Sequence, residues 1–325
     1  MRAVVHQEFG NPEEVLGVEE VPLPEPGEGE VRLRVIATPI HNHDLWTIRG
    51  EYGFKPDLPA RAGTELVGVV DALGEGVDGL EVGQRVATGA AFGAWAEYVV
   101  TRAGGLVPVA DGLSDEAAAQ LVAMPFSAIS LLESLELSAG DWLIQNAANG
   151  AVGRMLAQLA AARGVNVIGL VRRDAGIEEL AAHGIDKVIS TANDDWAEQV
   201  HELTGGAPIR VGVDSVGGSA AGDVLAQLAE GGTLVVFGAM NSPRLDLSSG
   251  DVIFKEATVK GFWGSKVVVS MPTEQRLRLF GELIQRASDG SLTLPVEATH
   301  SLEDVRTAAA ANARPGRAGK ILLRP

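Results

Sequence analysis

The stretch that decides the fold is Asp141-Trp142-Leu143-Ile144-Gln145-Asn146-Ala147-Ala148-Asn149-Gly150-Ala151-Val152-Gly153. An apolar run, typical of a buried strand, ends there in a turn of small residues. Residues 152–163 then follow a helical pattern, and residues 165–171 form a second apolar run. This order predicts a βαβ unit, in which the amides and the dipole of the helix N-terminus favour a bound pyrophosphate. We therefore predict a dinucleotide-binding site at this turn.

The turn matches only part of the glycine-rich dinucleotide pattern. Gly150 and Gly153 supply its second half, and Ala148 stands where the first glycine is expected. Small residues at a strand-to-helix turn also occur for close packing alone, so the neighbouring sequence has to decide. Here a strand pattern precedes the turn, a helix pattern follows it, and a basic pair comes about twenty residues later. Together these features favour the dinucleotide site.

The basic pair, Arg172 and Arg173, directly follows the second apolar run. In NAD enzymes this place usually holds an acidic residue that hydrogen-bonds the ribose 2′-hydroxyl. Two planar guanidinium groups suit a 2′-phosphate instead. A solvated strand end would explain one arginine, but a pair at this position favours the phosphate. We predict that the cofactor is NADPH.

Composition narrows the class of protein. A chain of 325 residues with 46% hydrophobic residues is long enough for about two domains with real cores. The net charge of −17 argues against nucleic acid or an anionic membrane as a partner. The absence of cysteine rules out disulfides and thiolate zinc sites. Residues 1–6 lead into a strand pattern and no apolar run reaches membrane-spanning length, so we expect a soluble, cytoplasmic protein that binds a small-molecule substrate.

Residues 1 to about 120 have a β-rich, irregular pattern. Strand patterns at 31–37, 65–72 and 84–87 are separated by turns rich in proline and glycine. Helix patterns are scarce before 115–122 and 125–135, so a compact barrel is favoured over a layered sheet for this part.

From residue 141 onward, strand and helix patterns alternate. The expected strands are 141–146, 165–171, 187–190, 209–214, 232–238 and 257–262, and the expected helices between them are 152–163, 175–183, 194–204 and 218–229. This alternation predicts the doubly wound dinucleotide-binding fold. Further expected elements are helices at 273–289 and 302–313 and a strand at 320–323.

With these elements in place, several motifs resemble the medium-chain dehydrogenase/reductase superfamily across essentially the whole chain. Residues 61–68 look like its PxxxGxExxG barrel motif, residues 77–86 like its GDRV turn, and residues 318–323 like its terminal strand. The resemblance implies an α/β chain with a GroES-like β-barrel catalytic domain and a doubly wound (Rossmann) domain. It implies a division into 1–121, 122–264 and a segment 265–325 that returns to the catalytic domain.

A catalytic metal is the first alternative to weigh. Zinc-dependent members of the superfamily have histidine where this chain has Thr64, and a structural lobe with four cysteines that this chain lacks. His41 and His43 are spaced by two residues without a convincing third ligand. We therefore expect no metal and interpret both histidines as loop residues that form hydrogen bonds.

Within the zinc-free members, four segments resemble the 2-enoyl thioester reductase group. They are residues 44–53, 145–153, 171–174 and 261–263, which look like the group's DxxxxxGxYG loop, QNAxNxxVG loop, basic strand end and GFW motif. Residues 124–127 depart from the group, because Met124 replaces the asparagine before the proline of its NPxTAY helix start.

The resemblance implies roles for individual residues. Tyr52 would be the catalytic acid, and Arg172 and Arg173 would bind the 2′-phosphate. Asn149, Gly150, Ala151 and Val152 would lie at the pyrophosphate. The rest of the cofactor would be lined by Phe237, Gly238, Ala239, Met240, Phe262, Trp263 and Lys320, with Ser127 supporting the site by a hydrogen bond.

Reduction of an activated alkene requires a positioned hydride donor, stabilisation of the carbonyl oxygen and a proton for the α-carbon. A phenol such as that of Tyr52 can hold and then release this proton. Two alternatives stay open. In a quinone oxidoreductase Tyr52 would matter little, and in a non-catalytic NADPH-binding sensor or scaffold it would be a loop anchor with a wet hydroxyl.

The expected sixth strand, residues 257–262, would lie at the open edge of the sheet. An apolar edge strand promotes aggregation unless it is covered. Pairing with the same strand of a second copy covers it. We therefore expect a homodimer.

Overall fold

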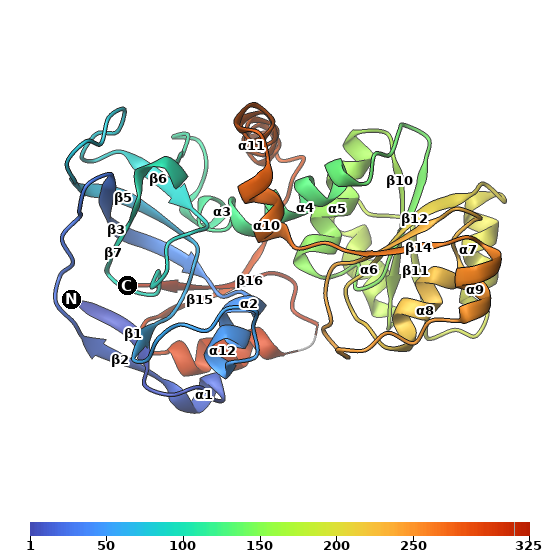
Figure 1. Cartoon of the computed structure of the whole chain (residues 1–325), viewed down its shortest axis with the longest axis horizontal. Helices are drawn as coiled ribbons and strands as arrows, with labels where there is room; N and C mark the ends of the chain where they lie inside the picture. Colours follow the sequence, from blue (N-terminus) through green and yellow to red (C-terminus); the bar gives the residue numbers. More distant parts are fainter. Residues whose placement is uncertain (315) are drawn as a thin grey trace. The chain divides into compact units, whose positions relative to one another are not determined.

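The computed structural model describes residues 1–314 and 316–325, and the chain divides into two compact units. Unit 1 comprises Met1–Met124, Ala287–Asp289 and Leu294–Pro325, whereas unit 2 comprises Pro125–Arg286 and Gly290–Thr293. In Figure 1 the two ends of the chain, blue and red, thus belong to the same unit. Residues 265–286, which the sequence-based division placed in the returning segment, group with unit 2.

Unit 1 is built on two sheets. The smaller has the order β2-β1-β4, and the larger has the order β15-β16-β3-β5-β6-β8 with β7 paired to β3. The pairs are antiparallel except β15 with β16. Their bounds are β1 Arg2–His6, β2 Leu16–Glu20, β3 Glu30–Pro39, β4 Ala60–Arg61, β5 Leu66–Leu73, β6 Arg85–Thr88, β7 Tyr98–Arg102, β8 Val107–Pro108, β15 Val296–Ser301 and β16 Lys320–Arg324.

Short helices connect these strands. They are α1 Pro12–Val15, α2 Asn42–Arg49, the 3-10 helix η1 Ala103–Gly105, α3 Asp115–Ala118 and α12 Val305–Ala313. The helix expected over 115–122 is therefore too long, because α3 ends at Ala118. The strands expected at 31–37, 65–72 and 84–87 are present as β3, β5 and β6.

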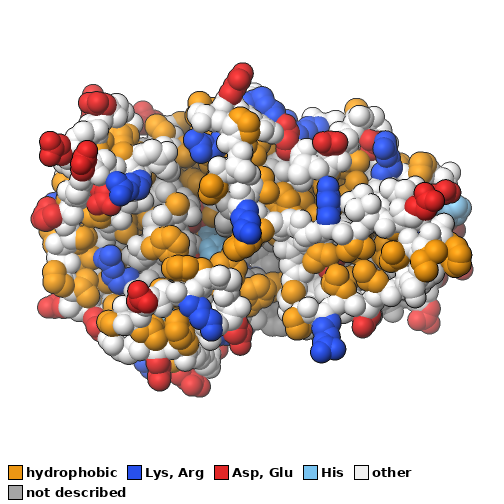
Figure 2. Space-filling view, in the orientation of Figure 1, with side chains coloured by type: hydrophobic (Ala, Val, Ile, Leu, Met, Phe, Trp, Pro, Cys, Tyr) orange, Lys and Arg blue, Asp and Glu red, His pale blue; other side chains and the backbone are white. Residues whose placement is uncertain are grey.

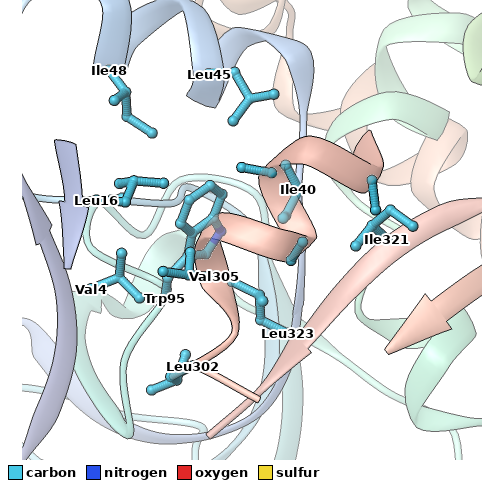
Figure 3. Packing of buried hydrophobic residues seen from close by; sticks show 14 residues of the cluster. Val4, Leu16, Ile40, Leu45, Ile48, Trp95, Leu302, Val305, Ile321 and Leu323 are labelled. Carbon is cyan, nitrogen blue, oxygen red and sulfur yellow. The ribbon is translucent and has the colours of Figure 1, made fainter. Parts of the chain in front are cut away.

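One hydrophobic core of unit 1 surrounds Trp95, which is completely buried (Figure 3). Side chains from both ends of the chain pack there, including Val4 and Leu16 from the start and Ile321 and Leu323 from the terminal strand. The indole Nε1 of Trp95 donates to the carbonyl oxygen of Pro39 at 3.2 Å, so its one polar atom is satisfied. The last strand therefore completes a core that the first strand begins.

Unit 2 contains a six-stranded parallel sheet with the order β11-β10-β9-β12-β13-β14. The strands are β9 Trp142–Gln145, β10 Asn166–Val171, β11 Val188–Ser190, β12 Ile209–Asp214, β13 Thr233–Val236 and β14 Thr258–Gly261. All six expected strands are present, and their order confirms the doubly wound sheet. The order reverses between β9 and β12, which is where such sheets bind ligands at the carboxyl ends of their strands.

The helices of this part of the chain are α4 Ala123–Ser134, α5 Ala151–Ala162, α6 Ala175–Ala181, α7 Trp196–Thr204, α8 Ser219–Ala226, α9 Ser249–Phe254, α10 Gly264–Ser270 and α11 Thr273–Ser288. Each of the four helices expected between strands is present. The sequence analysis missed α9 and α10, as it missed α2 in unit 1. Among the described residues, no helix combines the length and apolar character that crossing a bilayer requires.

Candidate active site

The loop between β9 and α5 presents the N-terminus of α5 at the carboxyl edge of the sheet. Gly150 is the N-cap residue and has no side chain that could bond to the first-turn amides. It is exposed, and Asn149, Ala151 and Val152 are each half-buried. Uncapped amides at the start of a twelve-residue helix provide donors for an anion. The four residues predicted at the pyrophosphate thus occupy a turn that fits one.

Close packing within this turn depends on Gly153. A Cβ at Gly153 would lie 2.8 Å from the carbonyl oxygens of Ala147 and Ala148 and 2.9 Å from the Cα of Ala148. Ala147 itself has a positive φ of 48°, and its carbonyl oxygen accepts from the Gly150 amide at 2.9 Å. The backbone of the turn therefore lies directly against the first turn of α5, with room for glycine alone.

We expect Gly153→Ala to displace this turn, since every neighbour that its Cβ would meet is backbone. The overpacking should lower the free energy of unfolding by about 1–3 kcal/mol and weaken NADPH binding. Thermal unfolding and a fluorescence titration with NADPH measure the two effects.

Gly281→Ala in α11 is the matched control, because a Cβ there would meet nothing within 4 Å. It should be neutral or stabilise by about 0.5–1 kcal/mol, as alanine does in helices. If Gly153→Ala behaves like Gly281→Ala, the turn is looser than described.

Arg172 and Arg173 follow β10, and both are exposed. Arg173 forms an ion pair with Glu179 at 3.0 Å, and the other oxygen of that carboxylate accepts from Asn149 Nδ2 at 3.4 Å. Within the part of the chain that the structure describes, Arg172 has no hydrogen bond or ion pair. Its guanidinium is therefore available to a phosphate, and it follows β10 next to Arg173, which Glu179 links to Asn149 in the turn before α5.

Asn146 and Asp214 connect the carboxyl ends of β9 and β12, where the strand order reverses. Both are buried, and Asn146 Nδ2 donates to Asp214 Oδ1 at 2.6 Å. The amide of Ser215 donates to Asn146 Oδ1 at 2.8 Å, and Gly217 donates to the Asp214 carboxylate. This bridge fixes the edge of the sheet. The sequence analysis gave Asn146 no role of its own, although a polar residue that ends a buried strand is a usable signal.

The other predicted lining residues follow β13 and β14. The rings of Phe237 and Phe262 stack at 5.9 Å, and Trp263 is 46% exposed with Lys266 Nζ 4.8 Å from its ring centre. A Cβ at Gly264 would lie 2.7 Å from Ser127 Oγ, so this hydroxyl lies close to the backbone that follows β14. Gly238, Ala239 and Met240 come directly after Phe237. These residues are thus gathered at the same edge of unit 2.

In unit 1, Tyr52 lies just beyond α2, which Gly50 ends with a φ of 73°. Tyr52 is half-buried, and its ring centre is 5.9 Å from that of His43. His43 Nε2 lies 2.9 Å from Thr64 Oγ1, and Thr64 donates to Asp44 Oδ1 at 2.8 Å. The predicted acid therefore lies beside a polar network.

A second network lies behind the first and is fully buried. His41 Nε2 lies 2.6 Å from Glu65 Oε2, and Lys320 Nζ lies 2.8 Å from His41 Nδ1. Glu65 Oε1 also accepts from the amides of Val122 at 2.7 Å and Ala123 at 2.6 Å. Lys320 is thus held inside unit 1, and its role at the cofactor stays a prediction.

Burial changes the titration of this buried network. It raises the pKa of Glu65 to about 7, against the opposing effects of the Ala123 and Val122 amides and the charge of Lys320. Burial also lowers the pKa of His41 well below its usual value, and the positive charges of Lys320 and His43 act in the same direction. His41 is therefore neutral near pH 7.

The histidine loop was interpreted as a hydrogen-bonding segment, and both of its histidines do form such contacts. The sequence analysis missed Glu65, whose signal is an acidic residue at the start of the apolar run 66–70. Among the described residues, no three His, Cys, Asp or Glu side chains are placed to hold a metal ion.

Comparison with known proteins identifies relatives of both units. The model of the alcohol dehydrogenase GroES-like domain matches residues 27–111, and the model of zinc-binding dehydrogenases matches residues 151–282. The mitochondrial enoyl-[acyl-carrier-protein] reductase of Arabidopsis thaliana is 34% identical over 303 residues, covering 91% of this chain and 80% of that protein. The human protein of the same name is 32% identical over 329 residues, covering 99% of this chain and 88% of that protein.

Solved structures give the same fold. Escherichia coli quinone oxidoreductase complexed with NADPH matches with a TM-score of 0.91 at 26% identity, covering 100% of both chains. The quinone oxidoreductase of Pseudomonas syringae matches with a TM-score of 0.88 at 28% identity, covering 100% of this chain and 99% of that chain. These likenesses confirm a GroES-like domain together with a Rossmann sheet, and the chain belongs to the oxidoreductases of the medium-chain dehydrogenase/reductase superfamily.

Proposed function

We propose that the protein reduces the C=C bond of a conjugated carbonyl, most concretely a 2-enoyl thioester, with NADPH as the reductant. The observation that carries this proposal is Tyr52, a half-buried phenol beside the His43 imidazole in a loop that resembles the tyrosine loop of enoyl thioester reductases. A phenol keeps its proton at neutral pH and can release it to a strongly basic enolate. The relatives named as enoyl-[acyl-carrier-protein] reductases support the same substrate class.

The carboxyl edge of unit 2 fits NADPH, which when bound supplies the hydride. The uncapped first turn of α5 would bind the pyrophosphate, and the exposed Arg172 and Arg173 would bind the 2′-phosphate. Phe237, Phe262 and Trp263 offer apolar surface at the ends of β13 and β14. The solved relative complexed with NADPH supports this choice of cofactor.

An NADPH-oxidation assay with three substrates tests the proposal. We expect a short 2-enoyl-coenzyme A to give the highest kcat/KM, followed by a simple enone and a quinone. Absorbance at the nicotinamide band gives the rate, and chromatography of the saturated thioester confirms that the C=C bond is reduced. A quinone that is reduced faster than the enoyl thioester would refute the proposed substrate class.

NADPH:quinone oxidoreductase is the second candidate, because solved relatives with TM-scores of 0.88 and 0.91 are named as quinone oxidoreductases. Quinone oxygens take their protons from solvent, so this reaction has no need of a proton donor to carbon. Tyr52 would then act as an anchor of its loop. The two candidate functions therefore differ in how the activity responds to the loss of the Tyr52 hydroxyl group.

We also propose a homodimer that is paired through β14. This strand lies at the edge of the parallel sheet, and all four of its residues are exposed. The helix before it, α9, exposes Ile253 and Phe254, which is 83% accessible. An uncovered edge strand next to apolar side chains favours pairing with a second copy.

Val259→Lys should weaken this pairing, since it adds a second charge to the edge strand beside Lys260 and removes an apolar side chain. We expect a dimer for the native protein and a shift towards monomer for the variant in light scattering at micromolar concentration. Val82→Lys is the matched control, because Val82 is 65% exposed in a turn of unit 1. A native monomer would count against the homodimer.

The proposed partner is a small molecule rather than nucleic acid. Figure 2 shows basic side chains interspersed with acidic ones across the face in view, and the net charge is −17. Such a surface does not attract a polyanion. The cytoplasmic location stays a prediction, and cell fractionation would test it against the mitochondrial location in the names of the curated relatives.

A further inference from the structure

His43 is the central member of a row of contacts in unit 1 that leads from a buried carboxyl group to Tyr52. Asp44 accepts from Thr64 at 2.8 Å, and Thr64 Oγ1 lies 2.9 Å from His43 Nε2. The rings of His43 and Tyr52 are 5.9 Å apart and tilted by 34°. The imidazole of His43 thus lies between the hydrogen-bonded pair of Asp44 and Thr64 and the phenol of Tyr52, which the proposed reaction uses.

The hydrogen bonds determine which nitrogen of His43 carries a hydrogen. Thr64 has one hydroxyl hydrogen and donates it to Asp44, so Thr64 accepts from His43 Nε2. His43 Nδ1 is then the position that takes up and releases a second proton. Asp44 Oδ1 lies 3.4 Å from His43 Nε2, while Asp44 Oδ2 accepts from the backbone amide of His41 at 2.9 Å.

Of the two stacked histidines, His43 is the one whose side chain reaches solvent. His41 stacks on it, with ring centres 4.9 Å apart and an angle of 18° between the rings. His41 is completely buried and stays neutral, because burial and the neighbouring charges of Lys320 and His43 lower its pKa. The side chain of His43 is 23% exposed, so it can exchange protons with solvent. The titratable and charged groups that face His43 are Asp44, His41 and Tyr52, with Glu65 and Lys320 beyond His41.

We propose that His43 is a positioning residue that returns a solvent proton to Tyr52 after each turnover, an inference that rests on the proposed function. The β-carbon of the substrate receives hydride, with its electron pair, from the reduced dinucleotide. The α-carbon then takes the hydroxyl proton of Tyr52, which becomes a phenolate. The phenolate takes a proton from the charged His43 ring, and His43 takes one from solvent. Each turnover therefore consumes one hydride and one solvent proton.

His43→Gln tests this assignment, because the glutamine amide can still donate to Thr64 but cannot carry a proton. We expect kcat for enoyl reduction to fall about tenfold. This loss is smaller than the roughly 10²–10⁴-fold loss that is typical when the group that transfers the proton directly is removed. The pH profile of kcat should change in the variant, because glutamine has no group that takes up or releases a proton. Added imidazole should restore part of the rate, and quinone reduction should not change.

His201→Gln is the matched control, because His201 is exposed on α7 of unit 2. A second measurement does not depend on turnover. Tyr98 is the only other tyrosine, so difference spectra against Tyr52→Phe isolate the ionisation of Tyr52. We expect His43→Gln to move the pH midpoint of that ionisation and His201→Gln to leave it unchanged.

The outcomes separate the two hypotheses. If Tyr52→Phe impairs enoyl reduction while His43→Gln keeps the native kcat and pH profile, the role of His43 is refuted and the proposed function stands. If the native protein reduces no enoyl thioester, the proposed function fails. In that case the spectral titration tests the role of His43 by itself. If the pH midpoint of Tyr52 ionisation is the same in His43→Gln as in the native protein, the two rings are not coupled and the role of His43 is refuted.

Discussion

Tyr52→Phe is expected to lower kcat for a 2-enoyl thioester by about 10²–10⁴-fold, the range typical of a side chain that transfers the proton directly. The substitution removes a hydroxyl group and keeps the ring, so the contact between the rings of Tyr52 and His43 should persist. NADPH affinity should barely change, because the residues that fit the phosphates lie in unit 2. Steady-state kinetics with an enoyl-coenzyme A and a fluorescence titration with NADPH measure the two quantities.

The other tyrosine provides the matched control. Tyr98 is half-buried on β7, where its backbone pairs with β3, so Tyr98→Phe should leave enoyl reduction unchanged. Quinone reduction should survive both substitutions, since its protons go to oxygen. Enoyl reduction by Tyr52→Phe within a few-fold of the native rate would remove Tyr52 from the chemistry and leave the quinone oxidoreductase as the better candidate.

The second large effect concerns the choice between NADPH and NADH. Replacing both Arg172 and Arg173 with alanine should abolish most of the preference for NADPH. Each charge-assisted contact to a phosphate is worth about 1.5–3 kcal/mol, or roughly a 10- to 100-fold change in affinity. NADH affinity should stay close to the native value because its ribose has no 2′-phosphate. Dissociation constants for both dinucleotides, measured by fluorescence, give the ratio.

Arg210→Ala is the control for the loss of positive charge. Arg210 lies at the start of β12, at the amino edge of the sheet, where its side chain is 67% exposed. Its removal should leave the preference intact. The arginine pair has no role in selection if the native protein binds NADH as tightly as NADPH.

The parallel sheet could be predicted because its strands other than β14 are mostly buried and therefore appear as apolar runs. The run 209–214 coincides with β12, whose residues are buried apart from Arg210. The residues expected at the cofactor gather at one edge of the sheet for the same reason, because parallel strands bring their carboxyl ends together. Their placement could be predicted since each directly follows its strand, and their role in binding the cofactor stays a prediction.

The elements that the sequence analysis missed are short or begin with polar residues. In α2 the start Asn42-His43-Asp44 has the character of a loop, and only its side chains at Asp44, Leu45 and Ile48 are buried. The helix expected over 115–122 was overestimated because apolar residues continue beyond Ala118 although the helix does not. Tertiary packing determines where α2 begins and where α3 ends.

The buried network could not be predicted because its members are distant in sequence. His41 is 24 residues from Glu65 and 279 residues from Lys320. No local pattern connects these three residues, and folding alone brings them together. The spacing of residues in the sequence is enough to identify those at the end of one strand. A cluster that is assembled from three separate segments can be identified only once the fold is known.

The division of unit 1 between the two ends of the chain has a consequence for synthesis on the ribosome. Unit 2 is almost continuous, so it can fold while the chain is still being made. The core around Trp95 has to wait for Val305, Ile321 and Leu323, which are added after unit 2 is complete. Until then, Val4 and Leu16 lack the side chains of the terminal segment that cover them. A nascent chain that stalls after unit 2 would therefore carry a finished unit 2 and an unfinished unit 1.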